Sequence, residues 1–121
     1  MTARRDRASR PTSESEEAER SAHAPPDLLA LRQAAHTATS AYTRAHNMYW
    51  ASPHEERTYR TCQETAARLD ATLTALLAYL ESLRGYDLER ERMARQQAVM
   101  RRDVALVEER AQLAVQRANT R

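Results

Sequence analysis

The sequence predicts an all-α protein: an antiparallel helical hairpin followed by a long C-terminal helix, forming a three-helix bundle or coiled coil behind a disordered N-terminal tail. Three observations predict it. Apolar residues recur at spacings of three and four on both sides of Ser52-Pro53, a third stripe follows the only glycine, Gly85, and the N-terminal segment has almost nothing to bury. The chain thus divides into a charged tail, a hairpin and an amphipathic helix, over residues 1–24, 25–84 and 85–121.

The N-terminal tail is rich in Arg, Ser, Glu and Pro. Four arginines oppose one aspartate in residues 1–10, and four glutamates oppose one arginine in residues 11–20. Such a segment buries too little apolar surface to offset the conformational entropy that folding removes. We therefore expect residues 1–24 to be disordered.

The hairpin is predicted by two apolar stripes that each keep a three-four spacing without a miss. Such spacing places one apolar seam along a helix, as in coiled coils. The first stripe comprises Leu28, Leu31, Ala35, Ala38, Tyr42, Ala45 and Tyr49, and the second comprises Tyr59, Cys62, Ala66, Leu69, Leu73, Leu76, Leu80 and Leu83.

The predicted helix boundaries come from capping residues. Asp27 is a suitable N-cap for a helix that begins at Leu28 and ends near Trp50. Ser52 can cap the second helix, with Pro53 at its first position and Glu55 reaching back as a capping box. The first helix is poor in charge, which indicates cover on more than one side.

The third stripe begins after Gly85 and is one residue out of phase with the leucines before it. Gly85 followed by Asp87 is typical of a helix end and a new N-cap, but one glycine also fits inside a continuous helix, at a cost of about 1 kcal/mol. Both alternatives stay open from the sequence. The stripe comprises Met93, Gln97, Met100, Val104, Val107, Ala111, Ala114 and Ala118, and Val99, Leu106 and Leu113 form a thinner line beside it.

Composition excludes several classes of protein. All 19 basic residues are arginine and the formal net charge is only +2, so no strong overall field attracts nucleic acid or anionic membrane. One cysteine, Cys62, cannot form an internal disulfide, and its seam position predicts a buried thiol. We find no signal peptide and no apolar run long enough to span a membrane. We therefore expect a cytoplasmic protein.

Catalytic and cofactor sites are not indicated. The histidines lack helical spacing to one another or to Cys62, and a metal site across the turn from His46 and His54 would lack further ligands. A single glycine cannot build a phosphate-binding loop. We expect that the protein is not an enzyme and that it binds no cofactor, metal ion or small-molecule substrate.

The predicted function is helical interaction or assembly, by self-association into a homo-oligomer or by binding a helical partner. Leucines near the end of the second helix extend beyond the first helix, and Trp50 need not face the second helix. The predicted partner-binding residues are Trp50, Leu77, Leu80, Leu83, Met100, Val104 and Val107. The alternative is an Arg-mediated nucleic-acid-binding accessory protein. Its phosphate contacts would come from Arg4, Arg5, Arg7, Arg10, Arg90, Arg92, Arg95, Arg101 and Arg102.

Trp50-Ala51-Ser52, between two helices of this length, resembles the family of small secreted helical hairpins that carry Trp-x-Gly at the bend. The resemblance covers residues 28–84 at most. It departs from the family at Ser52, where the glycine should stand, and at Tyr86, which has Arg90 rather than an acid four residues on. The resemblance implies a helical hairpin and no particular function.

Overall fold

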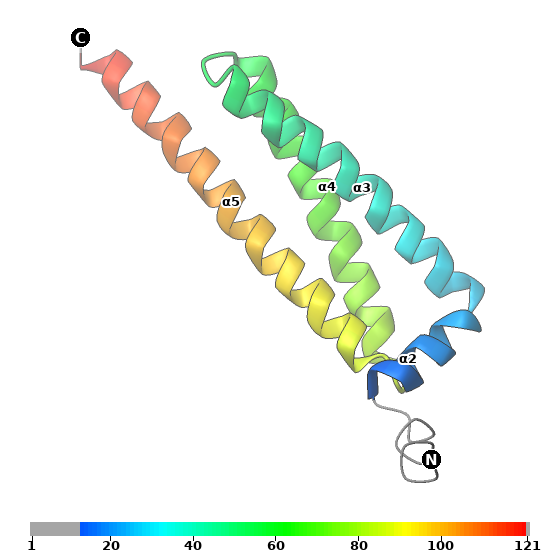
Figure 1. Cartoon of the computed structure of the whole chain (residues 1–121). Helices are drawn as coiled ribbons and strands as arrows, with labels where there is room; N and C mark the ends of the chain where they lie inside the picture. The colour runs from blue at the N-terminus through cyan, green and yellow to red at the C-terminus, as the bar shows by residue number, and fades with distance from the viewer. Residues whose placement is uncertain (1–12, 121) are drawn as a thin grey trace, which may run out of the picture.

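The computed structural model describes residues 13–120, which form four helices and no strand. Their bounds are Ser13–Ala22 for α2, Pro26–Ala51 for α3, Glu56–Glu81 for α4 and Asp87–Asn119 for α5. Helices α3, α4 and α5 are long and lie roughly alongside one another, with short α2 across their lower end (Figure 1). The all-α prediction is confirmed. No described helix is long and apolar enough to cross a membrane.

The antiparallel hairpin of α3 and α4 is confirmed, and the predicted seams are its core. On α3 every seam residue is buried except Leu31, which is partly buried. On α4 the seam from Cys62 to Leu80 is buried, while Tyr59 and Leu83 at its ends are partly buried. Small residues of α3, such as Ala35 and Ala38, face a leucine-rich helix, so the two backbones approach closely.

The turn between the hairpin helices differs from the capping-box prediction. The Ser52 amide donates to Met48 O at 3.0 Å and so closes α3 instead of opening α4. Helix α4 begins at Glu56, with no side-chain bond at its N-cap, Glu55. The Thr58 hydroxyl donates to Ser52 O at 2.7 Å and to Glu55 O at 2.9 Å. Thr58 therefore orders the loop before α4, the helix that Ser52 was expected to cap.

Gly85 marks a real break, so the alternative of one continuous helix is wrong. Its φ of +86° lies in the left-handed region that favours glycine. The Arg20 guanidinium occupies the space that a Cβ would need there. The chain reverses at this point, and α5 begins at Asp87 with Tyr86 as its N-cap.

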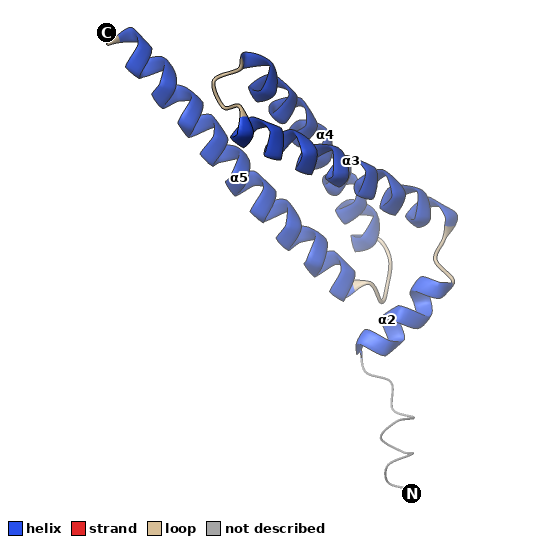
Figure 2. Ribbon diagram, turned by 45° about the horizontal axis from the view of Figure 1, so that its top comes forward, coloured by secondary structure: helices blue, strands red, loops and turns tan. Residues whose placement is uncertain are grey.

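Helix α5 packs along α4, which contacts both α3 and α5. The loop after α4 leads into α5 at the end of the bundle near α2 (Figure 2). Met100 and Val107 are buried against the hairpin, as the third stripe predicts. Gln97 is also buried, and its amide donates to Thr74 Oγ1 at 2.9 Å and to Asp70 Oδ1 at 3.1 Å. The polar position in the stripe is therefore satisfied within the chain.

Helix α2 corrects the prediction of a disordered tail for part of its length, since residues 13–22 are helical. The Glu17 side chain is buried against the start of α5, and the Tyr86 hydroxyl donates to Arg20 O at 3.2 Å. These tertiary contacts stabilise a helix whose own sequence has little to bury. Residues 1–12 lie outside the described residues.

Candidate interaction surface

Three of the predicted partner-binding residues lie in the core of the chain itself. Leu80, Met100 and Val107 are at most 5% exposed, so they do not present a surface to a partner in this structure. At the leucine-rich end of α4, Leu80 is therefore covered within the chain. After the turn at Gly85, Tyr86 joins the same core cluster, and Gln97 of α5 donates to Thr74 of α4, so the polar part of α5 packs on the hairpin.

The other predicted residues are more accessible. Leu77, Leu83 and Val104 are half-buried, and Leu83 and Val104 pack against the core. Trp50 is 44% exposed. Of the predicted set, only Trp50 is an exposed large side chain, and it lies at the end of α3 next to α5.

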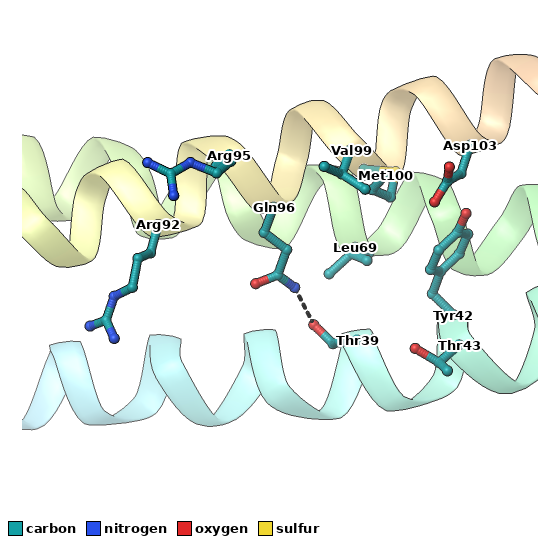
Figure 3. Close-up of a pocket in the computed structure, with 10 residues that line it drawn as sticks. All are labelled: Thr39, Tyr42, Thr43, Leu69, Arg92, Arg95, Gln96, Val99, Met100 and Asp103. Atoms are coloured by element: carbon teal, nitrogen blue, oxygen red, sulfur yellow. Dashed lines mark hydrogen bonds between the residues drawn. The ribbon is translucent and has the colours of Figure 1, made fainter.

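A groove runs between α3 and α5, with α4 as its floor, and encloses about 390 Å³. Thr39 and Tyr42 come from α3, Leu69 from α4, and Val99 and Met100 from α5 (Figure 3). Gln96 Nε2 donates to Thr39 Oγ1 at 3.0 Å and bridges the two helices across the groove. Most of the exposed lining is apolar. The groove therefore suits an apolar or amphipathic occupant.

Tyr42 is the buried polar residue of this groove. It is 7% exposed, and its hydroxyl is buried without a hydrogen-bond partner in the structure. Burial, with small contributions from Cys62 and Asp103, raises the pKa of Tyr42 to about 12. The neutral phenol therefore behaves as part of the apolar lining.

The line of Val99, Leu106 and Leu113 lies on the groove side of α5, and we call it the α5 outer stripe. These residues are seven apart and are 43%, 52% and 45% exposed. Val99 lines the groove, and a seven-residue spacing keeps the other two on the same side of the helix. The sequence had indicated this line only as a widening of the core stripe. In the structure it is a heptad seam that no described helix covers.

Trp50 lies in the last turn of α3, next to the α3–α4 turn and outside the residues that line the groove. Its Nε1 donates to His46 Nε2 at 3.1 Å, and its ring meets Tyr49 edge-on at 5.2 Å between centroids. The Arg110 guanidinium lies 5.8 Å from the centre of the Trp50 ring. Tryptophan and arginine are the residues that most often dominate binding energy at protein interfaces. Here both lie next to the α5 outer stripe.

The arginines of α5 do not form an uninterrupted basic face. Arg101 Nε donates to Asp70 Oδ1 at 2.7 Å, and Arg90 Nη2 lies 3.7 Å from Asp87 Oδ1. Arg92, Arg95 and Arg102 are exposed, and the acidic residues Glu91 and Asp103 flank this stretch of α5. The four tail arginines proposed for phosphate contacts lie outside the described residues.

Reactive groups are few in the described part of the chain. Cys62 is 1% exposed, and burial raises the pKa of its thiol, which disfavours the nucleophilic thiolate. His46 already accepts the bond from Trp50, and residues 13–120 contain no cluster of three or more potential metal ligands.

A polar cluster at the other end of α5 was missed from the sequence. The Glu17 carboxylate accepts from Leu88 N at 2.9 Å and from Glu89 N at 2.7 Å, and so caps α5 from a different helix. Glu89 in turn accepts two bonds from Arg32 of α3, one of them from Nε at 2.8 Å. The available signal in the sequence was Arg32, an isolated arginine in a helix poor in charge, but this signal does not reveal that its partner is Glu89.

No protein-family model matches the chain, and neither does any curated protein or solved structure in the comparisons.

Proposed function

We propose that the protein acts by binding a helix of a protein partner in the groove between α3 and α5, and not by catalysis. The observation that carries this proposal is the α5 outer stripe, a heptad seam left exposed beside an apolar groove. Three long helices with an open groove leave room for a fourth, which would complete a four-helix packing arrangement.

The energetics support a helical occupant. Burying an aliphatic side chain completely contributes about 1.5–3 kcal/mol, and the three stripe residues are each about half exposed before binding. Trp50 and Arg110 would add contacts of the kind that dominate interfaces. Together these groups supply an apolar centre with a polar rim, the usual anatomy of a protein interface.

Photo-crosslinking tests this proposal. A photoreactive phenylalanine analogue at position 106 should form adducts with a helical segment, identified by mass spectrometry, in cells that produce the protein. The matched control is position 108, because two residues along a helix point about 200° away. Adducts from both positions alike, or from neither, would contradict the proposal.

Nucleic-acid binding remains the alternative, and its support is the exposed Arg92, Arg95 and Arg102 on α5. Phosphate contacts of this kind weaken steeply with salt. Under the helix-binding proposal we expect no retention of the full chain on heparin at low salt. Strong, salt-sensitive retention that Arg92→Gln and Arg95→Gln together abolish would favour the alternative.

A further inference from the structure

We infer that the helix bound in the α3–α5 groove is α5 of a second copy of this chain, packed antiparallel with the two-fold axis close to Leu106. This inference rests on the proposed function and names its partner. Four features support it: the symmetry of the α5 outer stripe, the charges beside Leu106, the length of α5, and the composition of residues 1–12.

The α5 outer stripe is self-complementary in the antiparallel direction. Val99 and Leu113 lie seven residues before and after Leu106. An antiparallel pairing centred on Leu106 therefore sets each Val99 against Leu113 of the second copy and the two Leu106 side chains against each other. This is the self-matching patch that a two-fold interface requires.

The charges beside Leu106 select the antiparallel direction. Asp103 lies three residues before Leu106 and Arg110 lies four residues after it, both half-buried on the same side of α5. Antiparallel packing places Asp103 next to Arg110 of the second copy. Parallel packing would place like charges together at both positions, which is unfavourable. The antiparallel register also brings Arg95 near Arg117, but at a solvated rim where salt screens the repulsion.

The length of α5 supplies the segment that would be bound. With 33 residues it is seven longer than α3 or α4, which amounts to about 10 Å of extra helix. Its C-terminal end runs past the α3–α4 turn (Figure 1), and Leu113 and Val115 there are 45% and 59% exposed. In the antiparallel dimer this end would lie along the Gln96 end of the groove on the second copy.

The N-terminal segment of the chain does not supply this occupant. Residues 1–12, outside the described part, contain only Met1, Ala3 and Ala8 as apolar residues, without heptad spacing. They cannot offer an apolar seam to Val99, Leu106 and Leu113. A second copy can, because its own α5 outer stripe is exposed in the same way.

Sedimentation velocity of the full chain tests the inference. We expect a mass of twice 13.8 kDa at micromolar concentration. Leu106→Glu should shift the protein to monomer, while Leu29→Glu, at a 52% exposed position on α3, should leave the dimer intact. Helical circular dichroism of each variant confirms that it folds. A monomer at every concentration would overturn the inference, as would a dimer that Leu106→Glu leaves unchanged.

A charge exchange tests the register. Asp103→Arg and Arg110→Asp should each weaken the dimer at least tenfold, and the double variant should restore most of the affinity. No restoration would overturn the antiparallel pairing. The two proposals fail separately: a monomeric chain whose position 106 still crosslinks to another helical protein keeps the proposed function and loses the second copy.

Discussion

The two ends of α5 are held in opposite ways. At its start, Glu17 of α2 caps the helix and Arg32 of α3 binds Glu89, so three helices meet in one polar cluster. At its far end, Leu106 and Leu113 are about half exposed, and the Arg110 guanidinium lies over the Trp50 ring of α3. The first end is satisfied within the chain, whereas the second presents apolar surface. Under the proposed function, the first end serves folding and the second serves recognition.

The largest effect should come from the hairpin core, which both ends share. Leu73 is fully buried between the helices. We expect Leu73→Ala to lower the free energy of unfolding by about 2–4 kcal/mol, because it removes buried methyl groups and leaves a cavity. Leu29→Ala, on the exposed side of α3, is the control. A loss below about 0.5 kcal/mol in urea melts, within the range of surface substitutions, would contradict the core assignment.

Removing the cap that Glu17 of α2 forms should destabilise the start of α5, the end that is held within the chain. Glu17→Ala leaves the amides of Leu88 and Glu89 without their acceptor, so we expect a loss of about 1–2 kcal/mol in urea melts. Glu16→Ala is the matched control, because Glu16 is exposed on the same helix. Equal effects of the two substitutions would show that the Glu17 contacts do not hold α5.

A smaller effect is expected in the groove. The Tyr42 hydroxyl is buried without a partner, so Tyr42→Phe should leave stability at pH 7 unchanged or raise it by up to about 1 kcal/mol. Because burial raises the pKa of Tyr42 from 10.0 to about 12, the folded state holds its proton more tightly than the unfolded state. Wild-type stability should therefore fall as pH rises from 10 towards 12. Tyr42→Phe should remove part of this fall, and a marked loss of stability at pH 7 would contradict the assignment.

The smallest effect is expected for the bridge between α4 and α5. Hydrogen bonding to Arg101 holds the pKa of Asp70 below its ordinary value, with further help from Gln97. A depressed carboxyl pKa stabilises the fold above the unfolded-state pKa, and this contribution is lost as pH falls through the folded-state pKa. We expect Asp70→Asn to flatten the decline in stability below about pH 4. Identical acid titrations of wild type and variant would contradict this role for the bridge.

The sequence predicted most of the core because heptad spacing is a local property. The seams of α3 and α4 and the burial of Met100 and Val107 follow from it. The polar cluster at the start of α5 could not be predicted, since Glu17 and Leu88 lie far apart in sequence and no spacing rule links them. The exposure of the predicted partner residues could not be predicted for a related reason. Both Leu80 and Leu106 are apolar and regularly spaced, and only the reversal at Gly85 decides which of them is covered.

Hydrogen exchange along α5, measured at low and high protein concentration, tests most directly whether one end is held by the chain and the other by a second copy. Amides at residues 87–97 should be equally protected at both concentrations. Amides at residues 112–119, beyond the part of α5 that packs on the hairpin, should exchange fast when dilute and slowly when concentrated, and Leu106→Glu should abolish that gain. Protection of residues 112–119 that does not depend on concentration would contradict the account.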